Sequence, residues 1–164
     1  MKIIILLCSL MFWNISISQN IIELPKFQSI ESNIEASIEI VKSKESRIEI
    51  LNQKKHNEFL DWQVLDDKLT LKVKEQYENL DLKNILITIY TSNIQELVIT
   101  NRADISMSST FSTMNTLSVI SENGANVDLT NIVFNTLIIY KDSESDIKYK
   151  SVNTLINNKK PHKY

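Results

Sequence analysis

The tripeptide Asn-Thr-Leu occurs three times in the second half of the chain, at residues 115–117, 135–137 and 153–155. The intervals are 20 and 18 residues, and another leucine lies in the same phase 20 residues before the first copy. A repeat of this length is too short to enclose a hydrophobic core, so each copy has to stack on its neighbours. The spacing therefore predicts an array of stacked units over residues 94–157.

Apolar and polar residues alternate with a period of two from Ile34 onward, as in residues 34–40, 69–73 and 85–89. Such alternation is typical of strands that bury one face. The alternating segments are rich in β-branched Ile, Val and Thr, which suit a pleated and half-buried surface. We therefore expect an all-β protein.

Each repeat contains two alternating segments separated by a bend, so equivalent apolar residues of successive repeats should form buried columns. The fold class that we predict is a right-handed β-helix-like solenoid with coils of about 20 residues. The predicted columns are Leu97/Leu117/Leu137/Leu155, Ile99/Val119/Ile139 and Ile105/Val127/Ile147.

A leucine-rich repeat is the competing interpretation, because Met114-x-x-Leu117-x-Val119 also fits the opening of such a unit. A leucine-rich repeat would place a helix or an irregular turn in the second half of each unit. The residues that follow alternate instead, as Ala125-x-Val127-x-Leu129. This alternation favours the β-helix.

The N-terminus has the three parts of a secretory signal peptide. Lys2 precedes an apolar run at residues 3–13, and Ser16-Ile17-Ser18 supplies a small-x-small cleavage site, so we expect residues 1–18 to be removed. A membrane anchor is the alternative, but the run is shorter than the ~20 residues that a spanning helix needs. Lipid attachment at Cys8 is disfavoured because a leucine precedes this cysteine and too few residues remain for a signal core.

The mature chain is predicted to consist of one domain at residues 19–158 and a basic tail at 159–164. Loss of Cys8, the one cysteine, leaves it without a thiol, which excludes disulfides and cysteine nucleophiles. The formal net charge is −2 and no dense basic block occurs, which argues against a nucleic-acid partner. No segment after the signal peptide is apolar enough to span a bilayer. We expect the protein in the periplasm, on the outer surface or secreted.

Several segments are similar in pattern to one bacterial family. They are Phe27-x-x-Ile30 with residues 33–40 and 47–50, the strand-turn-strand segment at 62–71, and residues 85–97. Over residues 27 to about 157 the chain resembles the head GIN domain family of cell-envelope proteins, described as auto-transporter adhesins. The resemblance implies a secreted or envelope-associated β-solenoid.

The bends depart from the pattern of that family, whose members usually carry Ser-Gly-Ser-Gly-Asp there. The corresponding segments of this chain are residues 100–104, 122–126 and 143–146, and they contain a single glycine, Gly124. Asn and Asp adopt positive φ less readily than Gly, so bends that require this conformation are in question.

Asp104, Asn126 and Asp146 fall at one position of the repeat and should form a row along one face. Carboxylate and amide oxygens in such a row would suit a carbohydrate or a cation such as Ca²⁺. A row of solvated bend residues is the alternative interpretation.

No catalytic, cofactor-binding or metal-binding residue is predicted. Arg102 with Asp104, and Lys141 with Asp142, are local pairs of opposite charge that do not repeat in phase. The histidines, His56 and His162, are isolated, whereas zinc sites need clustered ligands.

The sequence thus predicts an exported, non-enzymatic protein that binds at the cell surface or envelope, with a surface glycan or a protein as partner and no cofactor. Two other classes remain open. One is a carbohydrate-active enzyme built on a β-helix, which would need a convergent pair of catalytic groups. The other is a purely structural envelope protein.

Overall fold

The structure is a computed structural model, and it describes residues 20–51 and 58–159 of the chain. The predicted signal peptide at residues 1–18, the basic tail beyond Lys159, His56 and His162 lie outside the described residues. Neither of the helices in the described ranges is long and apolar enough to cross a membrane.

Within the described residues, strands make up nearly all of the regular structure, with two short 3₁₀ helices between them. The helices are η1 (Glu75–Tyr77) and η2 (Ser109–Phe111). The strands are β1 (Asn20–Glu23), β2 (Ser29–Asn33), β3 (Ser37–Lys42), β4 (Arg47–Leu51), β5 (Leu60–Leu65), β6 (Lys68–Val73), β7 (Leu86–Thr91), β8 (Glu96–Ile99), β9 (Asp104–Met107), β10 (Thr113–Ser121), β11 (Asn126–Lys141) and β12 (Asp146–Lys159).

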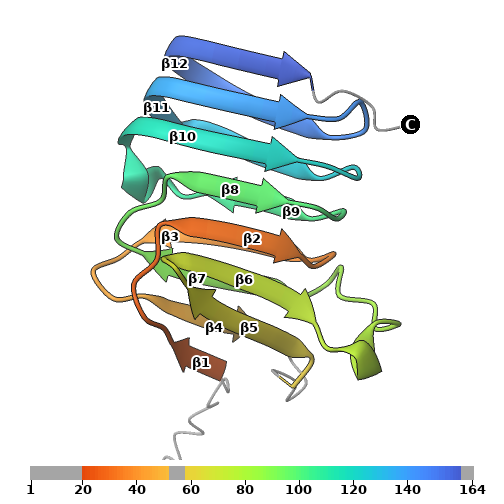
Figure 1. Ribbon diagram of the computed structural model, residues 1–164. Helices are drawn as coiled ribbons and strands as arrows, with labels where there is room; N and C mark the ends of the chain where they lie inside the picture. Colours follow the sequence, from red (N-terminus) through yellow and green to blue (C-terminus); the bar gives the residue numbers. More distant parts are fainter. Residues whose placement is uncertain (1–19, 52–57, 160–164) are drawn as a thin grey trace, which may run out of the picture.

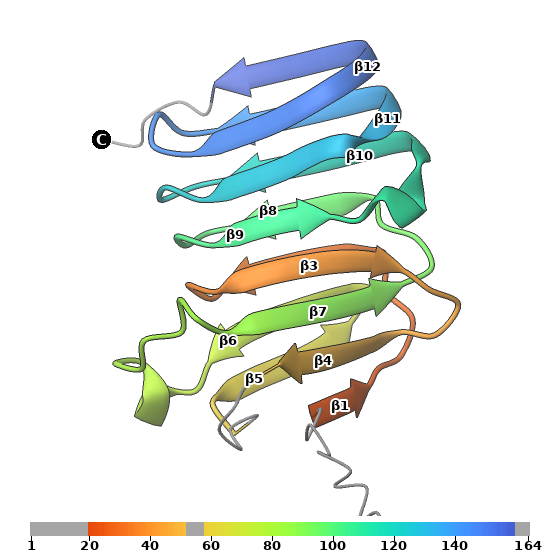
Figure 2. The same ribbon diagram turned by 180° about the vertical axis from the view of Figure 1, so that it is seen from behind.

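All of these strands belong to one mixed sheet that curls over on itself into a half-barrel (Figure 1 and Figure 2). The sheet runs β1-β4-β7-β3-β9-β11-β10-β8-β2-β6-β5, and β12 pairs with β11 beside this path. The long strand β11 connects the two halves, since its first residues pair with β9 and its later residues with β10. The apolar faces of the two halves therefore turn toward each other.

The predicted right-handed β-helix-like solenoid is wrong. A β-helix winds one parallel coil upon the next in chain order, but β4 pairs antiparallel with β1 and β7, and β5 pairs antiparallel with β6. In addition, β2 and β3 are inserted between β6/β7 and β8/β9, which come later in the chain. The first half of the chain has no tandem repeat to fix strand neighbours, so the alternation located strands without giving their order.

The repeats of the second half do stack in parallel, as predicted. Leu117 pairs with Leu137, and Leu137 pairs with Leu155. The predicted column of Ile105, Val127 and Ile147 is confirmed as well. The leucine-rich alternative is excluded, because the segment after each leucine continues as strand in β11 and β12.

The register between β8 and β10 differs from the prediction by two residues. Leu97 lies beside Val119 instead of Leu117, and Ile99 lies beside Ser121 instead of Val119. A shift of two residues keeps every side chain on its face of the sheet, because the strand pattern has a period of two. The hydrophobic pattern therefore fixed which residues point inward and left this register open.

The core fills the space inside the curled sheet. It is built almost entirely from the inward residues of the strands, with aromatic rings contributed by connecting segments. Its largest fully buried side chains are Phe27, Phe59, Phe134, Ile30, Ile34, Ile38, Ile40, Ile48, Ile50, Leu69, Leu71 and Ile87.

The bends between paired strands need little glycine. Asn123 and Gly124 both have positive φ, 59° and 78°, which is the geometry of a type I′ turn. The bend before Ala103 is a three-residue turn, in which its N–H donates to the Asn101 carbonyl at 2.7 Å. At the third bend the Asp142 carboxylate accepts hydrogen bonds from following backbone N–H groups at 2.9 and 3.1 Å. Of these three bends, only the one with Gly124 has residues with positive φ, so a glycine is present where this conformation is required.

Replacing Leu137 with Ala should lower the free energy of unfolding by about 2–5 kcal/mol, because it leaves a cavity in the leucine column. Leu137 is 0% exposed, whereas Leu65 on β5 is 60% exposed. Leu65→Ala should therefore cost about 1 kcal/mol or less. Urea unfolding of both variants measures the difference, and equal costs would contradict the proposed column.

Gly124→Ala should destabilise the protein by about 1 kcal/mol or more, since an L residue at positive φ is strained. The added Cβ would lie 3.6 Å from Arg102 Cγ, an ordinary contact, so the cost comes from the backbone. Asp67, in the turn between β5 and β6, also has positive φ, 58°. Asp67→Gly should therefore raise the urea midpoint, and opposite shifts of the two variants are the expected result.

Candidate functional site

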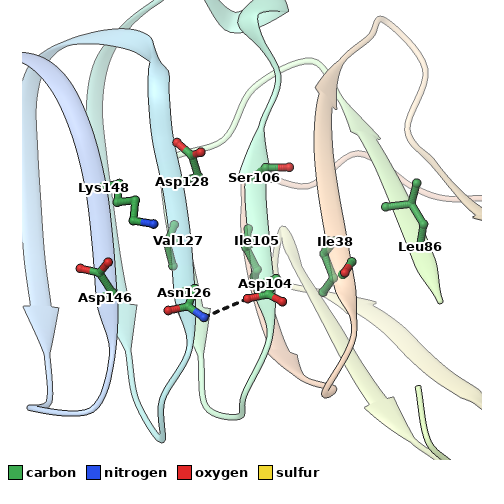
Figure 3. A pocket seen from close by; sticks show the side chains of 11 residues that line it. Ile38, Leu86, Asp104, Ile105, Ser106, Asn126, Val127, Asp128, Asp146 and Lys148 are labelled. Carbon is green, nitrogen blue, oxygen red and sulfur yellow. Dashed lines mark hydrogen bonds between the residues drawn. The ribbon is translucent and has the colours of Figure 1, made fainter. Parts of the chain in front are cut away.

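An open pocket of about 400 Å³ lies on the outer face of the sheet, over β3, β9, β11 and β12 (Figure 3). Every second residue of these strands points outward, so polar side chains of neighbouring strands lie next to one another. A second hollow of about 330 Å³ shares Ser37, Asp104 and Asn126 with the first. We call the two hollows together the polar groove.

The predicted row of Asp104, Asn126 and Asp146 crosses this groove. Asn126 pairs with Asp104 on one side and with Asp146 on the other, and Ser37 extends the row beyond Asp104. Neighbouring positions in such a row are ~4.8 Å apart, the spacing between strands. The row is therefore confirmed as a continuous line of polar side chains.

The amide of Asn126 is oriented by one hydrogen bond. Its Nδ2 donates to Asp104 Oδ1 at 2.9 Å, so its Oδ1 turns toward β12 and Asp146 (Figure 3). An amide oxygen and an ionised carboxylate can only accept hydrogen bonds. The space between Asn126 and Asp146 therefore suits a group that donates hydrogen bonds.

A second row runs beside the first and consists of Ser106, Asp128 and Lys148. Asp128 Oδ1 accepts hydrogen bonds from Thr130 Oγ1 at 2.6 Å and from Thr130 N at 2.9 Å. These bonds, with a smaller contribution from the Lys148 charge, hold the pKa of Asp128 below its usual value, although burial opposes them. The groove thus keeps a negative charge under mildly acidic conditions.

Lys148 supplies a hydrogen-bond donor within the same set of acceptors. Its side chain points toward β11 (Figure 3). The part of the chain that the structure describes shows no ion pair of Lys148 within 4.0 Å.

The two pairs of opposite charge noted in the sequence, Arg102 with Asp104 and Lys141 with Asp142, lie in different parts of the structure. Arg102 is exposed and lines the smaller hollow together with Asp104. Lys141 Nζ donates to the Ser145 carbonyl at 2.8 Å, and Asp142 accepts from Asn123 N at 2.7 Å. The contacts of Lys141 and Asp142 stabilise a bend and do not face the groove.

The sequence reasoning missed several groove residues. Asp128 and Lys148 lie 20 residues apart, each two positions after a member of the predicted row, so the repeat could have revealed them. Ser37 comes from the first half of the chain, where no repeat exists. Its place beside Asp104 follows from the insertion of β3 between β7 and β9.

The geometry does not favour the cation interpretation of the row. Within residues 20–51 and 58–159 no group of three or more His, Cys, Asp or Glu side chains could hold a metal ion. Ca²⁺ needs six to eight oxygen ligands, so the row falls short of a calcium site.

The family model described as "Putative auto-transporter adhesin, head GIN domain" matches residues 26–155. The chain belongs to this family. The resemblance inferred from the sequence is thereby confirmed, and the family description implies a place at the cell surface or envelope. None of the curated proteins matches the chain significantly.

Solved structures share the fold of this head GIN domain protein at low sequence identity. A putative adhesin from Parabacteroides merdae has a TM-score of 0.68 at 14% identity, covering 84% of this chain and 58% of that one. A putative lipid binding protein from Parabacteroides distasonis has a TM-score of 0.66 at 15% identity, covering 86% and 61%. A putative adhesin from Bacteroides fragilis has a TM-score of 0.60 at 13% identity, covering 85% and 96%. The chain thus spans about three fifths of the length of the first two structures.

Thr130→Val should raise the pKa of Asp128 toward its ordinary value, because it removes the hydroxyl donor that contributes most to the lowered value. A carboxylate with a lowered pKa stabilises the folded state above its unfolded pKa, and this stabilisation is lost as pH falls through the lowered value. The free energy of unfolding of the variant should therefore decrease less than that of the unaltered protein as the pH falls through the range in which Asp128 becomes protonated. Carboxyl-detected NMR titration measures the shift, and Thr136→Val, at the other end of β11, should leave it unchanged.

Proposed function

We propose that this head GIN domain protein is an exported, non-enzymatic binding protein of the bacterial cell envelope, whose polar groove holds a hydroxyl-rich ligand such as a surface glycan. One observation carries the proposal, namely that Asn126 donates its amide N–H to Asp104, so that its Oδ1 is left as an acceptor on the side of β12, where Asp146 is its cross-strand neighbour. The family description as an adhesin supports a binding role. The signal peptide predicted at residues 1–18 supports export.

Sugar hydroxyls match the groups that line the groove. A hydroxyl donates one hydrogen bond and accepts two, so it can bridge acceptors such as Asp146 and a donor such as Lys148. The distance between neighbouring strands lets adjacent hydroxyls reach adjacent members of the row. The two hollows share Ser37, Asp104 and Asn126, so together they could take more than one sugar unit.

Asp128 does not suit the role of the proton donor in glycoside hydrolysis. A glycosidase needs a carboxylic acid whose pKa is raised, so that it can protonate the leaving group. The pKa of Asp128 is shifted in the opposite direction, because Thr130 stabilises the ionised form. Asp128 therefore serves as a fixed hydrogen-bond acceptor.

A glycan array probed with the purified mature protein tests the proposal, followed by calorimetry on the strongest binder. Asn126→Ala should weaken binding ~10-fold or more, because it removes one acceptor and releases Asp104. The matched control is Asn135→Ala, since Asn135 also lies in β11 and also makes cross-strand amide hydrogen bonds. This control should bind as the unaltered protein does.

Each alternative class has its own outcome in this experiment. Absence of binding to any glycan would contradict the proposal and favour a purely structural envelope protein. Turnover of a bound polysaccharide would contradict the non-enzymatic part and favour a carbohydrate-active enzyme. Equal losses in the Asn126 and Asn135 variants would place the binding site outside the groove.

A further inference from the structure

A third hollow lies at one end of the strands, away from the polar groove. Its volume is about 550 Å³, and it shares no lining residue with the two hollows of the groove. Its walls come from the end of β3, the loop between β7 and β8, the last residue of η2 and the first residues of β10. These segments meet at the same end of the sheet, on the right in Figure 2. We call this hollow the end pocket.

Hydrogen bonds fix the loop that forms one wall of the end pocket. The buried hydroxyl of Thr91 donates to the Asn93 carbonyl at 3.0 Å. Gln95 N donates to the Gln28 carbonyl at 2.7 Å, and the Gln95 carbonyl accepts from Ser118 N at 2.9 Å. Contacts within the protein therefore hold this wall in place, which lowers the cost of ordering it around a ligand.

Another wall of the end pocket contains a strained residue. Ser112, between η2 and β10, has a φ of 44° and a ψ of −67°. Positive φ with negative ψ is the conformation of a rare and strained γ-turn. The residues on either side, Phe111 and Thr113, both line the end pocket. Strained backbone clusters at binding and active sites, so Ser112 is a second indication of function at this pocket.

A ladder of asparagine side chains presents a hydrogen-bond donor to the end pocket. Asn135 Nδ2 donates to Asn115 Oδ1 at 3.0 Å, and Asn153 Nδ2 donates to Asn135 Oδ1 at 3.1 Å. We call this row the asparagine ladder. Because Asn115 turns its Oδ1 toward β11, its Nδ2 lies on the side away from β11. The end pocket is on that side, since Asn115 lines it and no described lining residue belongs to β11.

The charge of the end pocket is opposite to that of the groove. Lys42, exposed at the end of β3, is the one charged side chain among the described residues that line the end pocket. The larger hollow of the polar groove is lined by three aspartates and one lysine. An anionic ligand is therefore attracted to the end pocket and not to that hollow.

We propose that the end pocket is a second binding site, which takes an acidic sugar through its carboxylate. Lys42 supplies the positive charge and Asn115 Nδ2 supplies a donor, and a carboxylate can accept hydrogen bonds from both. Gln95 Nε2 donates to Gln28 Oε1, so Gln95 Oε1 can accept from a sugar hydroxyl. A uronic acid unit carries a carboxylate and hydroxyls together, which matches this combination better than a simple inorganic anion does.

Calorimetry with tetragalacturonate and with its methyl ester tests the role of the carboxylate. The purified mature protein should bind the acid at low salt and bind the fully esterified form ~10-fold or more weakly, because the ester keeps the hydroxyls and loses the charges. Lys42→Gln and Asn115→Ala should each weaken binding of the acid ~10-fold or more. Circular dichroism of each variant checks that it is folded.

Two control variants separate the end pocket from general charge attraction and from the polar groove. Lys72→Gln removes an exposed lysine on β6 that does not line the end pocket, and Asn126→Ala alters the groove. Both variants should bind tetragalacturonate as the unaltered protein does. Absence of binding, equal binding of acid and ester, or equal losses in the Lys42 and Lys72 variants would overturn the proposal.

The end pocket and the groove are tested by different residues. A loss of tetragalacturonate binding in the Asn126 variant, with none in the Lys42 variant, would place the acidic sugar in the groove and overturn the second site. Binding of a groove ligand should be unaffected by Lys42→Gln, because Lys42 does not line the groove. Failure of this proposal is therefore distinguishable from failure of the proposed function.

Discussion

Lateral stacking of inward side chains from strand to strand is the interaction on which this structure depends. One such column contains Ile38, Ile105, Val127 and Ile147, which come from both halves of the chain. Each of them is buried, and burial of an aliphatic side chain of this size contributes about 1.5–3 kcal/mol. A slip of one residue in any strand would turn its apolar side chains to solvent. The columns therefore also fix which polar residues meet on the outer face.

The same stacking produces two polar rows of different character. In the row of Asn115, Asn135 and Asn153 each amide donates to the preceding one, so donors and acceptors match along the row. In the groove the central amide is flanked by Asp104 and Asp146, and only one of the two can take its donor. Donors and acceptors thus match within the asparagine ladder, whereas two carboxylates compete for the amide donor in the groove row.

The sequence predicted those features that follow from local periodicity. Alternation located most strands and their buried faces, and the repeat placed Asn126 between Asp104 and Asp146. Neither the alternation nor the repeat could predict the position of β3 in the sheet, because pairing between distant strands depends on how the whole chain closes its core. The two-residue shift beside Leu97 was hidden for a related reason, since both registers bury the same side chains. The β-helix prediction failed because it extended the order of the repeats to a part of the chain that has none.

The insertion of β2 and β3 makes the groove a property of the whole domain. Ser37 on β3 lies between Leu86 on β7 and Asp104 on β9, so the groove is bordered by the first half of the chain on one side and by the repeats on the other. Repeats alone would leave the β9 edge open and Asp104 without a neighbour on the side away from Asn126. Since β3 pairs in parallel with both β7 and β9, the early strands and the late repeats share one hydrogen-bonded sheet. The groove can therefore form only when both halves of the chain have assembled, which couples the binding face to the folding of the complete domain.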